Sequence, residues 1–310
     1  MCPRSPEDVK TIRGRPLIKT IAGVSVGIIA ISFAAIFIRL CDDVPSLMIA
    51  TYRLTLSSIV LLCIARARGT RFGSLSRRQL MLGMLGGFFL SLHFSLWISS
   101  LKFTSVASSV VLVTTNPIFV GLFSYLVFKE KQPPELIAGI VLSFCGSFIL
   151  ALGDSGLKGL AIENPSFLLG DVLALLGAVM ASGYLMVGSK LRAEMDLLSY
   201  TSVVYTFSAC FLLLTSLSSG ISFTGYKAGS YVFMVLLAVV PQLIGHTAIN
   251  WALKHLRTSM IAITILGEPI GASILAYIIF HETIRSFQGV GIVLIFLAII
   301  VASRKGAKTL

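Results

Sequence analysis

The stretch PIFVGLFSYLVFKEKQPPELIAGIVLSF, residues 117–144, decides the fold because the chain uses it twice. Moved forward by 152 positions, it lies on PIGASILAYIIFHETIRSFQGVGIVLIF, residues 269–296, and ten of the 28 positions are identical without a gap. An apolar composition produces chance matches among Ile, Val and Leu. It does not place Pro, Glu and Gly at the same distances from one another in both copies. The chain therefore contains a duplicated unit of about 150 residues.

Composition identifies the class of protein. Of 310 residues, 56% are hydrophobic and only 12% are charged, whereas a soluble domain carries roughly 25% charged residues. Apolar runs of about 18 residues or more recur, which is the length of a helix that crosses a bilayer. The alternating short segments of a membrane barrel are missing from the sequence. We therefore expect an all-α membrane protein that crosses the bilayer many times. Its five cysteines are scattered singly, so we expect no metal site, no disulfide framework and no cofactor.

Ten apolar runs divide the chain, and the charges between them set the topology. The predicted spans are 20–40, 45–65, 79–100, 105–128, 135–153, 168–189, 198–218, 230–252, 258–280 and 286–303. With the amino terminus in the cytoplasm, nineteen of the 25 Lys and Arg residues fall in cytoplasmic segments and five in external loops. This asymmetry predicts a protein of the cytoplasmic membrane with both termini cytoplasmic. It also explains the net charge of +12 without a nucleic-acid partner.

Five spans in each repeat is an odd number, so the second copy must enter the membrane from the opposite side. The sequence thus predicts two inverted-topology repeats, which enclose a binding site near the bilayer midplane. The expected organisation is a cytoplasmic segment 1–19, a first repeat 20–153, an external linker 154–167, a second repeat 168–303 and a cytoplasmic tail 304–310.

Each repeat places a polar residue directly before a proline in the middle of a span. These pairs are Asn116-Pro117 and Glu268-Pro269. Proline removes a backbone donor and clashes with the carbonyl four residues earlier, so both prolines predict helix kinks. A freed carbonyl at membrane depth must find a partner in protein or water. We expect a kinked helix beside a cavity, and the alternative is a kink that serves packing only.

Glu268 is the most informative single residue. An acid in mid-span costs ~2.5–3.5 kcal/mol on insertion scales and normally faces an interior cavity. It has two interpretations. Glu268 is either a proton carrier or cation site, or a structural acid neutralised by Arg53, the only basic residue well inside a span. Arg53 has alternatives of its own, as an anion contact or as a side chain that snorkels outward.

Histidines occupy matching places in the third and eighth spans. His93 is followed by Trp97, and His246 is followed by Asn250 and Trp251. A histidine in a membrane span often has only a packing role, and aromatic residues near span ends are often interface anchors. Their presence in both copies favours a cavity that binds solute. Tyr184 and Tyr205 are further candidates for contact with the solute from the second repeat.

No catalytic centre emerges from the sequence. Residues 23–27, GVSVG, spell the nucleophile pattern of hydrolases. That pattern needs a strand-to-helix turn, and here it lies in an unbroken apolar helix. No nucleophile–base pair and no metal set can be assembled from the remaining residues. We therefore expect a protein that is not an enzyme.

Several short motifs give the chain a family resemblance that covers both halves. They are Ala50-Thr51-Tyr52-Arg53, Thr104-Ser105-Val106-Ala107-Ser108, Asn116-Pro117 with Glu130 and Gly139, Thr258-Ser259, and Gly267-Glu268-Pro269 with Glu282 and Gly291. With them the chain resembles the EamA-type members of the ten-helix drug/metabolite transporter superfamily. The resemblance implies export or exchange of small metabolites such as amino acids, or of drugs, by alternating access.

The sequence thus predicts a transporter of small organic solutes in the lipid bilayer, with protons as a candidate coupling ion. An uncoupled facilitator is the alternative within the class, and an intramembrane enzyme or a scaffold are the alternatives outside it. The solute, the direction of transport and the presence of a homodimer are left open by the sequence.

Overall fold

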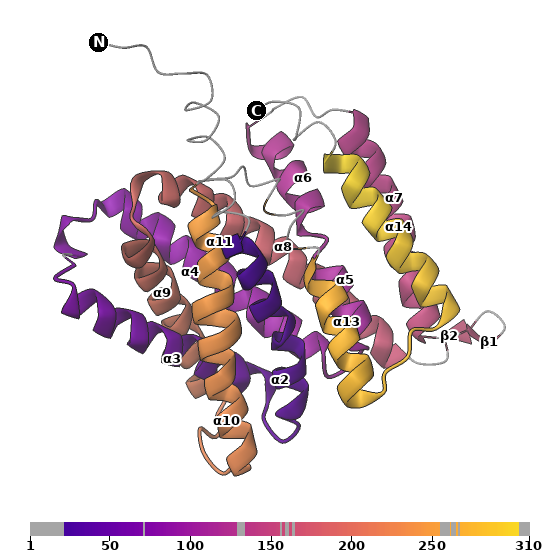
Figure 1. The fold of residues 1–310 in the computed structure, drawn as a ribbon, viewed down its shortest axis with the longest axis horizontal. Helices are drawn as coiled ribbons and strands as arrows, with labels where there is room; N and C mark the ends of the chain where they lie inside the picture. Colours follow the sequence, from indigo (N-terminus) through magenta and orange to yellow (C-terminus); the bar gives the residue numbers. More distant parts are fainter. Residues whose placement is uncertain are drawn as a thin grey trace, which may run out of the picture.

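The computed structural model describes residues 22–70, 72–128, 134–155, 157–158, 161–162, 165–254, 261, 265 and 267–303. In the first half, helical residues from Ala22 run into α2 (Ala34–Leu40). The further elements of this half are α3 (Ser46–Ala67), η1 (Phe72–Ser74), α4 (Arg77–Ser100), α5 (Val106–Val113), α6 (Asn116–Phe128) and α7 (Pro134–Ser155). Figure 1 shows these helices in indigo to magenta.

A short antiparallel ribbon follows the first half, where the sequence predicted a linker. It pairs β1 (Leu157–Lys158) with β2 (Ala161–Ile162). The helices of the second half are α8 (Pro165–Glu194), α9 (Leu197–Ser218), α10 (Ala228–Leu237), the π-helix η2 (Ala238–His246), α11 (Thr247–Ala252), α13 (Gly267–Phe280) and α14 (Ser286–Ser303). Apart from the ribbon, the regular structure of the described residues is helical.

Seven helical stretches of the described residues are long and apolar enough to cross a membrane. They are Ala22–Leu40, Ser46–Ala67, Arg77–Ser100, Val106–Phe123, Pro165–Glu194, Leu197–Ser218 and Ala228–Ala252. A shorter apolar helix, Gly267–Phe280, lies within the predicted ninth span. The all-helical membrane class is confirmed, and the arrangement of ten spans in two repeats stays a prediction. The motif Thr258-Ser259 and Glu130 lie outside the described residues.

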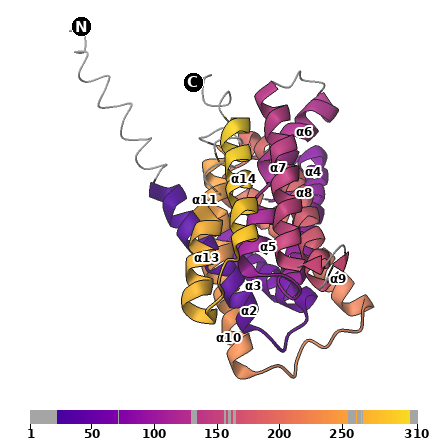
Figure 2. The same ribbon diagram turned by 90° about the vertical axis from the view of Figure 1, so that its right-hand side faces the viewer.

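Helices α7 and α14, which end the two halves, pack side by side (Figures 1 and 2). Gly146 lies in this interface. A Cβ at this position would lie 2.9 Å from Ile295 Cγ1 and 3.0 Å from the carbonyl oxygen of Gly291. Glycines let two membrane helices come this close, and dispersion contacts then hold them. The same stretch that is duplicated in the sequence therefore supplies both partners of one interface.

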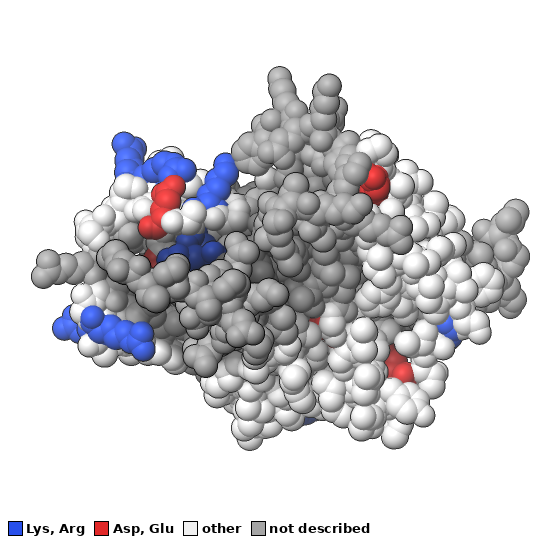
Figure 3. Space-filling view, turned by 45° about the horizontal axis from the view of Figure 1, so that its top comes forward, with Lys and Arg blue, Asp and Glu red and all other residues white. Residues whose placement is uncertain are grey.

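Charged side chains join segments far apart in the chain, and most of the described surface in Figure 3 is uncharged. Three ion pairs are Arg39–Glu282 at 3.7 Å, Arg78–Glu194 at 2.7 Å and Lys227–Asp42 at 3.0 Å. In the topology expected from the sequence, both partners of each pair lie on the same side of the membrane. The pairs are therefore consistent with that topology, although they do not say which side is cytoplasmic.

Candidate functional site: a polar cavity between the two halves

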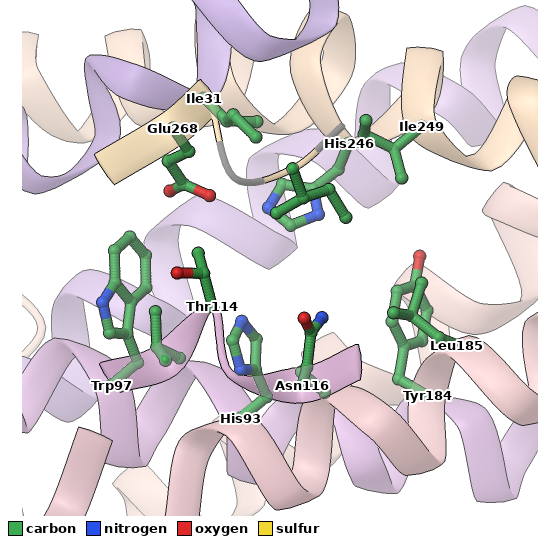
Figure 4. Close-up of a pocket in the computed structure, with 13 residues that line it drawn as sticks. Ile31, His93, Trp97, Thr114, Asn116, Tyr184, Leu185, His246, Ile249 and Glu268 are labelled. Carbon is green, nitrogen blue, oxygen red and sulfur yellow. The ribbon is translucent and has the colours of Figure 1, made fainter. Parts of the chain in front are cut away.

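A cavity lies inside the helix bundle and receives side chains from both halves of the chain. Its volume is about 50 Å³, counted as space for the centres of water-sized molecules, which is enough for a few waters. Figure 4 shows Glu268 and His246 on one side, facing His93, Trp97 and Asn116 on the other. The remaining lining residues are Ile31, Val113, Thr114, Ala181, Tyr184, Leu185, Ile249 and Ile265. Six of the nine residues that the sequence proposed for solute contact thus meet here.

A break in the fourth predicted span positions Asn116. Helix α5 ends at Val113, a turn covers Thr114 and Thr115, and α6 begins at Asn116, directly before Pro117. The Thr114 hydroxyl donates to the carbonyls of residues 110 and 111, and the Thr115 hydroxyl donates to that of residue 112. These bonds satisfy carbonyl groups at a depth where water is scarce. The predicted kink at Pro117 is therefore a true break between two helices.

Pro269 lies in the first turn of α13, which begins at Gly267. Proline is tolerated there, because the first N–H groups of a helix have no intrahelical partner. Most of the residues before α13 lie outside the described part of the chain. The kink predicted at Pro269 stays a prediction, and its carboxylate neighbour Glu268 projects into the cavity from the start of this helix (Figure 4).

The eighth predicted span contains a π-helix that the sequence analysis did not predict. It covers Ala238–His246 and includes Pro241. π-Helical turns are rare in proteins, and those that do occur are frequently found at functional sites. The hydroxyl of Ser57 in α3 donates to the Ala238 carbonyl at 3.1 Å. Two residues in the sequence, Pro241 and the following Gln242, were the signals of this irregular helix. They point to a span that is neither regular nor purely apolar.

Arg53 is fully buried, with an exposed fraction of 0%. Its Nε donates to Gln242 Oε1 at 2.8 Å. The guanidinium carbon lies 4.0 Å from the centroid of the Phe94 ring and 6.0 Å from that of the Trp97 ring. A desolvated cation above an aromatic face gains about 2 kcal/mol or more. Arg53 therefore does not snorkel outward, and it lies behind the cavity wall that Trp97 forms.

The structural ion pair between Glu268 and Arg53, one of the two interpretations of Glu268, is not formed. Among the described residues, no carboxylate oxygen lies within 4.0 Å of the Arg53 guanidinium. The two groups still act on each other electrostatically across the site. Glu268 thus faces the cavity without a direct basic partner, which is the arrangement expected of a group that exchanges protons or cations.

His93 is held in one orientation by its neighbours. Its Nδ1 lies 3.0 Å from the Gly177 carbonyl oxygen of α8. A carbonyl only accepts, so Nδ1 carries the proton and Nε2 is the free acceptor of the neutral ring. The ring is parallel to that of Trp97, with centroids 6.1 Å apart and planes 6° apart. On the opposite side, the His246 ring meets Phe94 edge-on at 5.4 Å.

A hydrogen-bonded group of three predicted residues lies behind the cavity. The Tyr184 hydroxyl donates to Asn250 Oδ1 at 2.7 Å, and Asn250 Nδ2 donates to the Tyr205 hydroxyl at 3.2 Å. Tyr184 lines the cavity, whereas Tyr205 and Asn250 are fully buried and support it. Trp251 lies elsewhere, next to Gly23 on an outward groove. The structure therefore places Trp251 outside the cavity. It also brings Phe94 and Gln242, which the sequence analysis missed, against Arg53 behind the cavity.

The fold and the cavity define a class of protein. Membrane helices from two halves of a chain that enclose a buried polar site are the architecture of a secondary transporter. The chain belongs to the EamA-like transporter family, whose model matches residues 18–152 and 168–304, one match in each half.

Curated relatives agree with this class, and a solved structure shares the fold. An "Uncharacterized transporter" of Archaeoglobus fulgidus is 22% identical over 265 residues, covering 83% of this chain and 87% of that protein. "Uncharacterized transporter YyaM" of Bacillus subtilis is 23% identical over 262 residues, covering 82% and 83%. A solved structure titled "Crystal structure of protein" has a TM-score of 0.65 at 19% identity and covers 93% of this chain and 98% of its own. That likeness shows a shared fold.

Proposed function

We propose that the protein moves small organic metabolites or drugs across the cytoplasmic membrane, as an exporter or exchanger, by alternating access around the cavity. One observation carries this proposal. Polar side chains of both halves, His93, Trp97 and Asn116 opposite His246 and Glu268, face one buried space inside apolar helices. A membrane protein that serves only as a scaffold has no use for these side chains, because each of them is expensive to bury.

The alternating motion that we propose is a movement of two inverted repeats, residues 20–153 and 168–303, with both termini cytoplasmic. Three observations support it. The family model matches once in each half. Helices α7 and α14, the last of each half, pack against each other. The ion pairs at the ends of the helices join segments that this topology places on one side.

Glu268 is the group that we propose for coupling transport to protons. It faces the cavity, and Arg53 acts on it electrostatically but does not form an ion pair with it. A carboxyl group in this position takes up a proton from one side of the membrane and releases it to the other as the cavity changes access. Arg53 remains a cation in both states.

The test is solute flux into proteoliposomes that contain the purified full-length protein, with and without an imposed pH gradient. Radiolabelled amino acids, nucleosides and cationic dyes are the probes. Ala181→Phe fills the cavity wall and should abolish flux, whereas Leu176→Phe on the exposed face of α8 should leave it intact. Flux that only runs downhill, and that the gradient does not drive, identifies an uncoupled facilitator. Flux that Ala181→Phe leaves intact would refute the cavity as the transport path.

A further inference from the structure

Four buried nitrogen atoms beside the cavity donate no hydrogen bond. They are Nη1 and Nη2 of Arg53, Nε2 of Gln242 and Nε1 of Trp97. Arg53 and Gln242 have an exposed fraction of 0%, and Trp97 has 2%. All four atoms are donors that cannot accept a hydrogen bond. Buried polar groups in proteins nearly always have a partner, so four orphaned donors in one place point to an acceptor that belongs there.

Arg53 is the neighbour of both other residues that carry these donors. The orientation of the Gln242 amide follows from its bond with Arg53, because only Oε1 can accept from Arg53 Nε at 2.8 Å. The amide nitrogen is thereby left without a hydrogen bond of ordinary geometry, and the Tyr205 hydroxyl is its neighbour. Trp97 lies beside the guanidinium, with its ring centroid 6.0 Å from the guanidinium carbon, and it also lines the cavity. The Arg53 guanidinium, which carries two of the four orphaned donors, therefore lies next to the cavity wall that Trp97 forms.

We propose that Arg53 binds a carboxylate group of the transported solute, with Trp97 and Gln242 as supporting donors. The inference rests on the transport function proposed above and specifies its substrate class. A carboxylate presents two oxygens in one plane, which match the two Nη donors of a guanidinium fork. It also carries one negative charge, which matches the single cation of Arg53. A phosphate dianion would require a second permanent cation, and in the described part of the chain no Lys or Arg lines the cavity.

Beside its polar side chains the cavity is lined by apolar ones, and this apolar surface favours an apolar body for the rest of the solute. Ile31, Leu185 and Ile249 supply that surface, as labelled in Figure 4. The substrate class is thus a small organic monocarboxylate with an apolar body. Phe94 covers the other face of the guanidinium and meets His246 edge-on. The solute reaches Arg53 when the aromatic wall of Phe94 and Trp97 moves aside, so Arg53 is buried while it has no ligand.

Binding is measured on the full-length protein in lipid nanodiscs. The chain has two tryptophans, and Trp251 lies outside the cavity, so Trp251→Phe leaves Trp97 as the only indole. Phenylacetate, hexanoate and lactate are each compared with their own amides, and inorganic phosphate is added separately. We expect at least one carboxylate to change Trp97 emission saturably and to raise the Tm, with no response to its amide or to phosphate. Equal responses to an acid and its amide, or no response to any acid, would overturn the inference.

Variants assign the binding to Arg53. Arg53→Lys keeps the positive charge but removes the two parallel Nη donors of the guanidinium. It should weaken carboxylate binding about tenfold or more. Arg66→Lys, at an exposed position of the same helix, should change nothing. Gln242→Glu places a carboxylate of the protein itself next to the guanidinium. This variant should therefore have a raised Tm and should no longer bind the carboxylate. If Gln242→Glu still binds it with the original affinity, Arg53 is not the site.

The two proposals fail in different ways. If carboxylates bind as described but no labelled solute crosses the proteoliposome membrane, transport is refuted and the Arg53 site stands. If solutes cross and neither Arg53→Lys nor Gln242→Glu changes carboxylate binding, the Arg53 site is refuted and transport stands. If only bridging waters bind to the Arg53 donors, no acid should change Trp97 emission or the Tm. That result would overturn the inference.

Discussion

The carboxylate of Glu282 accepts a hydrogen bond from the backbone N–H of Val106, at 3.1 Å for Oε1 and 3.2 Å for Oε2, although the two residues are 176 positions apart. Val106 is the first residue of α5, so a side chain of the second half satisfies the start of a helix in the first half. The same carboxylate lies 3.7 Å from Arg39 Nη2, which also donates to the Thr104 carbonyl. Glu282 therefore stabilises the amino-terminal end of α5 from the other half of the chain.

We expect Glu282→Ala to lower the free energy of unfolding by about 1–2 kcal/mol, because a negative cap at a helix start is lost. This corresponds to a decrease in Tm of a few degrees. The matched control is Glu194→Ala, which breaks the exposed pair with Arg78 at the end of α8. An exposed pair is worth only ~0–1 kcal/mol. Equal Tm values for the two variants would contradict the capping role of Glu282.

Asp43 makes stability depend on pH at the turn before α3. The hydroxyl of Ser230 and then the backbone N–H of Lys227 lower the pKa of Asp43 from its usual value of 3.8 by hydrogen bonding its ionised form. A pKa lowered in the folded state contributes stability above the unfolded pKa, and that contribution is lost as the pH falls through the folded pKa. Asp43→Asn should therefore have a lower Tm than the unchanged protein at pH 7. The two Tm values should converge below pH 3.8. A difference that is constant with pH would show that charge is not the cause.

The topology can be tested by cysteine labelling, but Cys41 itself is a poor reporter. It is fully buried, and burial raises the pKa of its thiol to about 12, so the reactive thiolate is scarce. In a variant without its native cysteines, Thr224→Cys should be labelled in intact cells by a reagent that does not cross membranes. Thr70→Cys should be labelled only after permeabilisation. Labelling of Thr70→Cys in intact cells would refute the predicted inverted repeats.

The break before α6 should matter for transport more than for folding. Pro117→Ala restores a backbone donor at the start of α6, and it should leave the Tm unchanged or raise it. Transport should fall, because alternating access uses the break as a hinge. Pro269→Ala should act in the same way, and Pro45→Ala, at the exposed start of α3, is the control. Full transport by both well-folded variants would make these prolines packing features.

Glu268→Gln should abolish accumulation driven by a pH gradient and leave some downhill exchange, because the amide keeps the shape of the side chain but does not titrate. The measurement is uptake into vesicles with and without the gradient. The double variant with Arg53→Gln should show no rescue of folding, since the two side chains form no ion pair. Gradient-driven accumulation in a folded Glu268→Gln protein would remove Glu268 from the coupling mechanism.

The sequence predicted the helices and most of the cavity for a simple physical reason. Apolar runs and rare polar residues such as Glu268 and Asn116 have few possible roles in a bilayer, so their placement is informative. Hydropathy carries no information on which face of a helix turns inward. For this reason Trp251 was expected in the cavity and lies outside it, while Asn250, its neighbour in the chain, supports the cavity from behind.

Backbone irregularity was harder to predict than position. The π-helix around Pro241 depends on tertiary bonds such as Ser57 to Ala238, and a hydropathy pattern does not contain them. The partner of Glu282 was also out of reach. No sequence pattern links Glu282 to the backbone N–H of Val106, which lies 176 positions away in the opposite half of the chain.

The buried Arg53 has a consequence for how the protein is made. Helix α3 precedes α4 in the chain, so α3 enters the membrane before Phe94 and Trp97 of α4 can pack against Arg53. An arginine near a span's centre opposes insertion by up to ~3 kcal/mol, and the nine Leu, Ile and Val residues of α3 favour it by roughly 3–5 kcal/mol in sum. Insertion of α3 is thus close to balance. A polar substitution on its lipid-facing side, such as Ile59→Asn, would therefore reduce the amount of protein that reaches the membrane even where the folded transporter would tolerate it.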